Sequence, residues 1–173
     1  MNNKLFSTKE LVLVALFAAV MAISAWVAVP AAIPFTMQTF AVFFAVGALG
    51  LKCGFTAVFV YVLIGCMGLP VFAGFGGGIG VLFSPNGGFI IGFLPAALVC
   101  GLLSKKAKTF ASLSLSMAAG LVICYIIGSA YFAKISGMDA KSVIISCIIP
   151  YVIPDTVKIL LAAALSQRIK KHV

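Results

Sequence analysis

Long apolar runs, separated by short polar or Gly- and Pro-rich stretches, dominate the pattern along this chain. The runs do not alternate apolar and polar residues with a period of two, as the strands of a membrane β-barrel do. We therefore expect helices, and the runs predict six membrane spans: residues 10–29, 36–51, 54–68, 89–103, 111–132 and 142–166. Several are shorter than the roughly 20 residues of a straight span, which indicates local thinning of the bilayer or loops that fold back into it.

The amino-acid composition favours insertion into a membrane. Of the 173 residues, 64% are hydrophobic and 9% are charged, whereas a soluble domain is about half apolar and about a quarter charged. A soluble domain of this length could not bury so much apolar surface. We therefore predict an all-α integral membrane protein, in which a six-transmembrane-helix bundle forms a single transmembrane domain over residues 1–173.

The basic residues, which give a net charge of +9, gather at the ends of the apolar runs. Six spans would place both termini and the loops after the second and fourth spans on one side of the membrane. That side carries Lys4, Lys9, Lys52, Lys105, Lys106, Lys108, Arg168, Lys170 and Lys171. The other side carries only Lys134 and Lys141, against Asp139. Because basic residues concentrate on the cytoplasmic side, we predict that both termini are cytoplasmic, and we expect no nucleic-acid partner.

A Gly-rich stretch lies between the third and fourth predicted spans. Residues 72–89 contain seven glycines, which disfavour a regular helix, yet their phenylalanines keep the stretch apolar. We expect an outer lid packed against the top of the bundle. The glycines lack the G-K-[ST] ending of a P-loop, so the chain is not expected to hydrolyse ATP. Asn86 lies in the turn before the fourth span. Its side chain can cap that helix, offer its amide to a ligand, or do both.

Asp155 and Lys158 interrupt the last apolar run. They are one helical turn apart and share a face. An ionisable side chain within a membrane costs at least about 2.5–3.5 kcal/mol, so it usually faces a partner or a wet cavity. Pro154 suits the first turn of a new helix, which would put Asp155 among free N–H groups near the outer surface. A polar ligand could bind there; alternatively, the two residues neutralise each other and fix a helix contact.

Small residues form a face on the first predicted span. Ala15 and Ala19, like Ala18 and Ala22, are four residues apart, a spacing that allows close approach of another helix. We predict that these alanines bind a partner helix. The spacing does not show whether that helix belongs to this chain or to another protein.

Side chains suited to catalysis or metal binding are sparse. The cysteines are scattered singly, at Cys53, Cys66, Cys100, Cys124 and Cys147, and the one histidine is His172 in the tail. No zinc or redox spacing and no nucleophile–base pair results. We expect neither enzymatic activity nor a metal or cofactor.

Four stretches read in order along the chain are Pro34-Phe-Thr-Met-Gln-Thr-Phe-Ala-Val42, Gly68-Leu-Pro-Val-Phe-Ala-Gly74, Ser84-Pro-Asn-Gly-Gly-Phe-Ile-Ile-Gly-Phe93 and Pro150-Tyr-Val-Ile-Pro-Asp-Thr-Val-Lys158. They resemble the motifs P-x-T-x-Q-T-x-A-V, G-L-P-V-F-A-G, G-P-[TN]-G-G-Y-L-x-G-F and P-x-x-P-G-D-x-x-K of the BioY family, the biotin-specific S-components of energy-coupling factor (ECF) transporters. Each motif alone is weak, but the ordered combination is specific. Pro154 and Ser84 replace the glycines usual at those positions, which could shift the backbone of the pocket.

The resemblance implies a ligand site near the outer surface, between the loop after the third span and the start of the last helix. It implies that Asp155, Lys158 and Asn86 contact biotin, and Gln38 is a further candidate because it lies in the turn that leads into the second span. The alanine face becomes the docking surface for the transmembrane T-component, and separate ATPase subunits, two in number, supply the energy. The protein would lie in the plasma membrane of a prokaryote.

We therefore expect a subunit that captures biotin outside and delivers it inward with its partner proteins. Two alternatives stay open. One is an S-component for another vitamin. The other is a structural membrane subunit without a ligand, in which Asp155 and Lys158 would only join helices.

Overall fold

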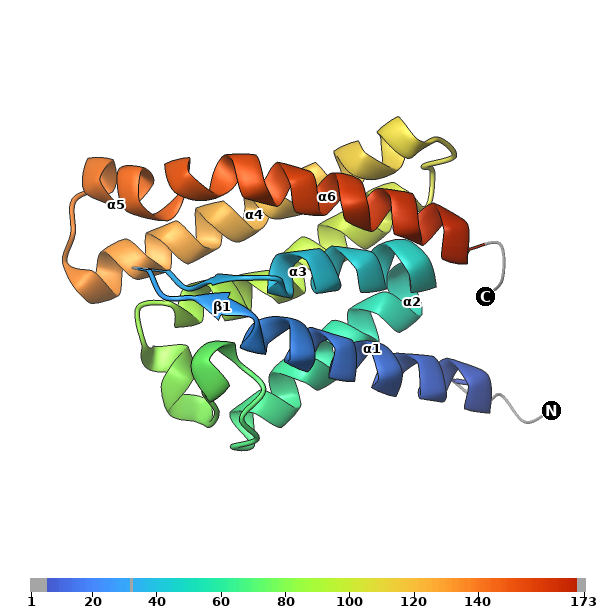
Figure 1. The fold of residues 1–173 in the computed structure, drawn as a ribbon, viewed down its shortest axis with the longest axis horizontal. Coiled ribbons are helices and arrows are strands. Elements are labelled where there is room, and N and C mark those ends of the chain that lie inside the picture. The colour runs from blue at the N-terminus through green and yellow to red at the C-terminus, as the bar shows by residue number, and fades with distance from the viewer. Residues whose placement is uncertain (1–5, 32, 171–173) are drawn as a thin grey trace.

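The computed structural model describes residues 6–31 and 33–170, and their fold is a bundle of helices (Figure 1). The helices are α1 (Thr8–Trp26), α2 (Gln38–Cys66), α3 (Gly87–Ser104), α4 (Phe110–Ser136), α5 (Ala140–Cys147) and α6 (Ile149–Ile169). Two short strands, β1 (Ala28–Val29) and β2 (Phe35–Thr36), pair antiparallel between α1 and α2. The 3₁₀ turns η1 (Ala73–Phe75) and η2 (Ile79–Phe83) lie between α2 and α3. Among the described residues, five of the six α-helices, all but α5, are long and apolar enough to cross a membrane.

Helix α1 begins at a complete capping box. The Ser7 hydroxyl accepts from the Glu10 backbone N–H at 3.2 Å, and the Glu10 carboxylate accepts from the Ser7 N–H at 2.7 Å. Both contacts satisfy donors that the first turn of a helix leaves free. Glu10 also forms an ion pair of 3.1 Å with Lys52 of α2, which joins the two helices at this end of the bundle.

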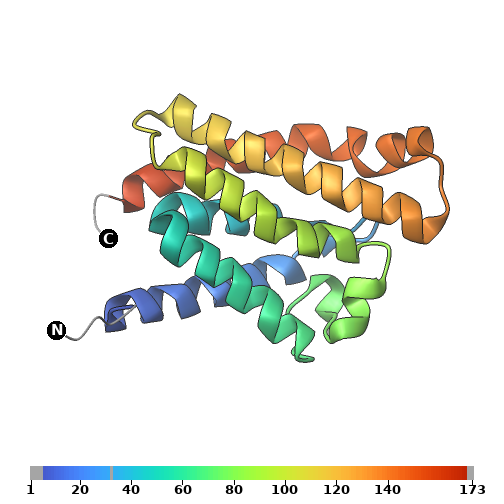
Figure 2. The ribbon, with the colours of Figure 1, turned by 180° about the vertical axis from the view of Figure 1, so that it is seen from behind.

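Helix α2 contains a sharp break at Gly50, where φ is 75° and ψ is −176°. This backbone conformation is nearly exclusive to glycine. The chain reverses direction there, so that α2 consists of two arms (Figures 1 and 2). The arms approach closely because Gly54 lies against the backbone of Val46. The predicted spans 36–51 and 54–68 correspond to these arms, but the predicted boundary at Lys52 was wrong, since Lys52 is helical.

The predicted last span, residues 142–166, is not a single helix. It divides at Ile148 into α5 and α6, and Pro150 lies in the first turn of α6. The expectation that Pro154 begins the helix was wrong, because Pro154 lies inside α6. Both prolines suit the first turn of a helix, where the backbone N–H has no partner within the helix. The sequence therefore could not show which of the two prolines begins α6.

Helix α2 lies at the centre of the bundle, where it packs against α1, α3 and α6, while α3 packs against α4. Small buried residues let the backbones approach: Gly120 of α4 lies against the Ala96 carbonyl of α3. Large apolar side chains cover the outside, among them Leu115 and Ile153, which are 71% and 77% exposed. The β1–β2 ribbon and the segment of η1 and η2 lie at one end of the bundle, opposite the start of α1 and the end of α6 (Figure 1).

Candidate ligand pocket

A cavity of about 260 Å³ lies at the end of the bundle that carries the ribbon and the 3₁₀ turns. The turn before α2, the start of α2, the η1–η2 segment, the start of α3, the middle of α4 and the first half of α6 all contribute to its wall. Phe72, Ile90 and Phe93 supply apolar surface. The polar side chains in the wall are Thr36, Gln38, Thr39, Ser84, Asn86, Tyr125, Tyr151, Asp155 and Lys158. Such a lining, largely apolar with a few converging polar groups, is typical of a small-molecule site.

Asp155 is 3% exposed, and its carboxylate accepts three hydrogen bonds from three different helices. Oδ1 accepts from Thr39 of α2 at 3.0 Å and from Lys158 of α6 at 2.7 Å. Oδ2 accepts from the Tyr125 hydroxyl of α4 at 2.6 Å. Because α6 begins at Ile149, Asp155 lies beyond its first turn, and these side chains, instead of free N–H groups at a helix N-terminus, satisfy the carboxylate.

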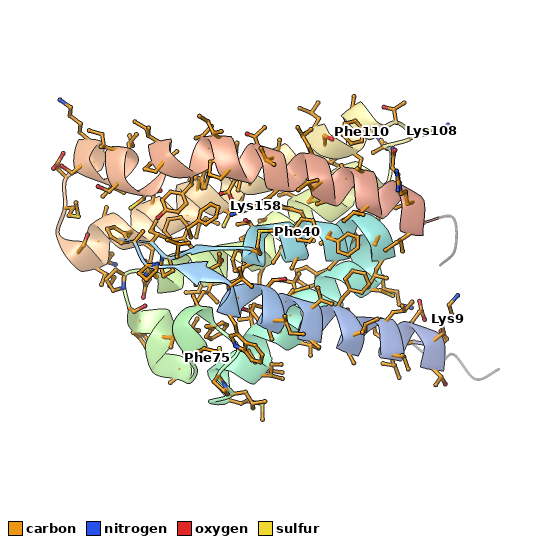
Figure 3. The ribbon with its side chains drawn as sticks, in the orientation of Figure 1. Lys9, Phe40, Phe75, Lys108, Phe110 and Lys158 are labelled. Atoms are coloured by element: carbon orange, nitrogen blue, oxygen red, sulfur yellow. The ribbon has the colours of Figure 1, made fainter. Side chains whose placement is uncertain are left out.

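Lys158 is also buried, with 5% exposure, and points into the interior between α6 and α2 (Figure 3). Its ammonium group lies 2.7 Å from Asp155, 3.3 Å from the Thr39 hydroxyl and 4.0 Å from the centre of the Phe35 ring. An ammonium over an aromatic face is attracted to the negative face of the ring. Among the described residues of the cavity wall, Asp155 and Lys158 are the only charged side chains, and together they are neutral.

Asn86 precedes α3, but its side chain makes no capping hydrogen bond. Its amide oxygen is buried and has no hydrogen-bond partner among the described residues. Leaving a buried acceptor unpaired costs about 1–3 kcal/mol. Of the two interpretations of Asn86, the side-chain cap is therefore wrong, and contact with a ligand stays a prediction.

Gln38 occupies the first position of α2 and lines the cavity. Its amide oxygen accepts from the Thr36 hydroxyl at 3.0 Å, and its amide nitrogen donates to the Tyr61 hydroxyl at 2.5 Å. All four predicted ligand residues, Asn86, Gln38, Asp155 and Lys158, thus line one cavity.

Comparison with known proteins places this arrangement in a family. The model of the BioY family matches residues 1–173. The chain belongs to the BioY family. It is 40% identical over 164 residues to "Biotin transporter BioY" of Thermotoga maritima, covering 94% of this chain and 96% of that protein. It is 37% identical over 163 residues to "Probable biotin transporter BioY" of Pyrococcus horikoshii, with the same coverage.

A solved structure, "Crystal structure at 2.1 A of the S-component for biotin from an ECF-type ABC transporter", has the same fold. The TM-score is 0.90 at 23% sequence identity, and the match covers 100% of this chain and 95% of the other. The sequence resemblance to the BioY family is therefore confirmed, together with an all-helical membrane-protein fold.

Sequence reasoning missed several polar residues of this BioY-family pocket. Thr36 and Thr39 flank Gln38, so their position near a predicted site residue was a usable signal. Tyr125 and Tyr151 each carry a hydroxyl within an apolar run, and this was a weaker signal of a site residue. Tyr151 lies one turn before Asp155 on α6, and its hydroxyl donates to the Ile33 carbonyl.

The match to biotin also implies that the phenylalanines around Phe72 and Phe75 exclude water from the ligand, but these two residues separate in the structure. Phe72 is 1% exposed and lines the cavity. Phe75 (labelled in Figure 3) is 62% exposed and is not among the residues that line the cavity. Its ring stacks on Trp26 with the centres 5.2 Å apart, so the expectation for Phe75 was wrong.

The predicted alanine face of α1 also divides. Ala18 and Ala22 are 3% and 7% exposed and pack inside the bundle. Ala15 and Ala19 are exposed. Ala18 and Ala22 are therefore unsuited to contact a partner protein, because the chain's own helices cover them. Because a helix has 3.6 residues per turn, the pair Ala15 and Ala19 and the pair Ala18 and Ala22 lie on different sides of α1.

Proposed function

We propose that this chain is the biotin-binding, substrate-capturing subunit of an ECF-type transporter. The observation that carries the proposal is a cavity whose wall holds both the unpaired acceptor of Asn86 and the buried group of Asp155, Lys158 and Tyr125. The relatives named as biotin transporters support it. Transport, not catalysis, is the activity that follows.

The chemistry of biotin fits the lining of this cavity. The ureido ring of biotin has two N–H donors and one carbonyl acceptor, next to an apolar ring and an aliphatic tail. Tyr125 donates its only hydroxyl hydrogen to Asp155, so its oxygen is left to accept from a ligand N–H. Asn86 Oδ1 can accept from the other. Lys158 and Gln38 are the donors for the ureido carbonyl or the tail carboxylate, and Phe72 covers apolar surface.

Isothermal titration of the purified, detergent-solubilised protein with biotin tests this function. We expect sub-micromolar binding that Asp155→Ala abolishes or strongly weakens, because the carboxylate fixes the Tyr125 hydroxyl and the Lys158 ammonium group in the ligand site. Thr156→Ala is the matched control, since Thr156 is the exposed neighbour of Asp155 on α6. No heat from the unaltered protein would refute the function, and undiminished binding by Asp155→Ala would refute the site. Competition by thiamine or riboflavin would instead indicate another vitamin.

The same proposal includes an orientation in the plasma membrane of a prokaryote. The two arms of α2 would count as two crossings, and α5 with α6 as one, which gives six. Both termini would then be cytoplasmic, with the pocket and the η1–η2 lid outside. The distribution of basic residues supports this orientation.

The partners we propose are a transmembrane T-component and, through it, two ATPase subunits. The exposed pair Ala15 and Ala19 on α1 offers a small-residue surface for a helix of the T-component. Ala19→Trp should reduce recovery of the T-component in a pull-down while biotin binding is retained. Val122→Trp adds similar bulk to an exposed position on α4 and should leave recovery unchanged. Equal recovery with both variants would count against this surface.

A further inference from the structure

Three segments that cover or border the pocket are each tied to the bundle by a tyrosine hydroxyl. Tyr151 donates to the Ile33 carbonyl, Tyr131 to the Leu82 carbonyl at 2.9 Å, and Tyr61 to the Val71 carbonyl at 3.0 Å. Tyr61 differs from the other two because its hydroxyl also accepts a hydrogen bond from the pocket residue Gln38, at 2.5 Å. It is therefore the tyrosine that joins a covering segment to a predicted ligand contact.

The directions of these hydrogen bonds follow from the groups involved. A carbonyl oxygen only accepts, so Tyr61 must donate its single hydroxyl hydrogen to Val71. The same hydroxyl can then only accept from Gln38, which turns the amide nitrogen of Gln38 toward Tyr61. Thr36 donates to the amide oxygen of Gln38 at 3.0 Å and holds the other side. One N–H and one lone pair of this amide are left with a fixed orientation.

The far end of this chain of hydrogen bonds is the start of the lid. The Pro70 carbonyl accepts from the Trp26 indole N–H at 2.8 Å, so two consecutive lid carbonyls, of Pro70 and Val71, are held by α1 and α2. Phe72, the next residue, lines the cavity and packs edge-on to the Tyr61 ring with centres 5.6 Å apart. Tyr61 is fully buried, so water does not compete for its hydroxyl.

We infer that Tyr61 is a positioning residue of the ligand pocket, which orients the Gln38 amide toward the ligand and couples it to the lid at Val71. The inference rests on the proposed function. Without the hydroxyl, the Gln38 amide is free to turn over, and the Val71 carbonyl loses its partner. The effects of Gln38 and Tyr61 on the ligand are therefore coupled through the hydrogen bond that joins them.

A double-mutant cycle on biotin affinity tests this coupling. Tyr61→Phe keeps the buried ring and removes only the hydroxyl, and we expect it to weaken biotin binding about tenfold. Gln38→Leu should weaken binding by a similar factor. The double variant should bind more tightly than the product of the two single effects predicts, because the Gln38–Tyr61 hydrogen bond can be lost only once.

Tyr131→Phe is the matched control, because it removes a tyrosine hydroxyl bound to the lid without touching Gln38. The factors by which Tyr131→Phe and Gln38→Leu each weaken biotin binding should multiply in the double variant. Multiplying effects of Tyr61→Phe and Gln38→Leu, or unchanged affinity of Tyr61→Phe, would overturn the inference. If the unaltered protein does not bind biotin, the proposed function fails, and the thermal unfolding midpoints of the same ligand-free variants decide whether Tyr61 and Gln38 are coupled.

Discussion

Asp155 and Lys158 form a buried ion pair, with 2.7 Å between the ammonium nitrogen and Oδ1. Such a pair stabilises the ligand-free fold and can also recognise a ligand. The two roles differ in what they require. A helix contact requires only that neither charge is left alone, whereas recognition requires the carboxylate and the ammonium themselves.

Replacing one or both members of the pair separates these roles. Lys158→Met should lower the free energy of unfolding by about 3–5 kcal/mol, because it leaves the Asp155 carboxylate buried without a counter-charge. The double variant Asp155→Asn with Lys158→Met should recover most of that loss, yet it should not bind biotin. Thermal unfolding and isothermal titration of the same samples provide the two measurements. Biotin binding by a stable double variant would mean that the pair only joins helices.

At this scale the sequence predicts which residues carry polar chemistry but not what they touch. Asp155, Lys158, Asn86 and Gln38 stand out because each is polar beside or within an apolar run. Thr39 and Tyr125 reach Asp155 from positions 116 and 30 residues away in the chain. That convergence depends on how α2, α4 and α6 pack, and no local pattern contains it.

At the scale of elements, the apolar runs located the helices, while the breaks depended on backbone geometry. The reversal in α2 occurs at Gly50, a glycine that looks like the others in an apolar run, whereas Lys52 looked like a loop residue. Lys52 is helical, and its ammonium group forms an ion pair with Glu10 of α1. The ion pair is a tertiary contact, so hydropathy alone favoured the wrong boundary.

Gly50→Ala tests the importance of this reversal. Alanine is a better helix former than glycine, but it would be strained at φ 75° and ψ −176°, so we expect a loss of about 1–3 kcal/mol in the free energy of unfolding. No atom lies within 4 Å of the added methyl group, so the backbone alone causes the loss. Gly80→Ala is the control, because that position has open space and no positive φ. Equal unfolding midpoints for both variants would contradict the argument.

Asp139 caps the start of helix α5, and its carboxylate accepts from the Ser142 hydroxyl at 2.6 Å and the Ser142 N–H at 3.1 Å. These hydrogen bonds favour the ionised form and lower the pKa of Asp139 below its ordinary 3.8. A lowered pKa means that the cap stabilises the fold above the ordinary pKa, and that this stability is lost as the pH falls through the folded value.

Carboxyl ¹³C NMR of aspartate-labelled protein can follow this titration, because the chain has only two aspartates, Asp139 and Asp155. We expect the exposed Asp139 to titrate below pH 3.8. Ser142→Ala removes the hydroxyl donor and should raise the pKa toward that value, whereas Ser114→Ala on α4 should not. An Asp139 pKa that does not change in Ser142→Ala would show that the cap does not cause the shift.

At the scale of the whole molecule, the shortness of the α2 arms explains why a pocket can form at one end of the bundle. The arms of α2 on either side of Gly50, residues 38–49 and 51–66, have 12 and 16 residues. At 1.5 Å per residue they are roughly 18 and 24 Å long, less than the roughly 30 Å of a bilayer core. The arms therefore leave room, at the end away from Gly50, for the ribbon and the η1–η2 segment. The pocket lies at that end, with walls from α2, α4 and α6 and from the η1–η2 segment.

This arrangement predicts which loops face outward. In a variant whose five native cysteines are replaced by alanine, single cysteines are introduced by Gly80→Cys in the lid, Met138→Cys between α4 and α5, and Lys106→Cys between α3 and α4. A membrane-impermeant maleimide applied to intact cells should label the first two variants and spare the third. After lysis all three should be labelled, which controls for access. Labelling of Lys106→Cys in intact cells, or protection of Gly80→Cys, would invert the orientation and place the pocket on the wrong side for capture from outside.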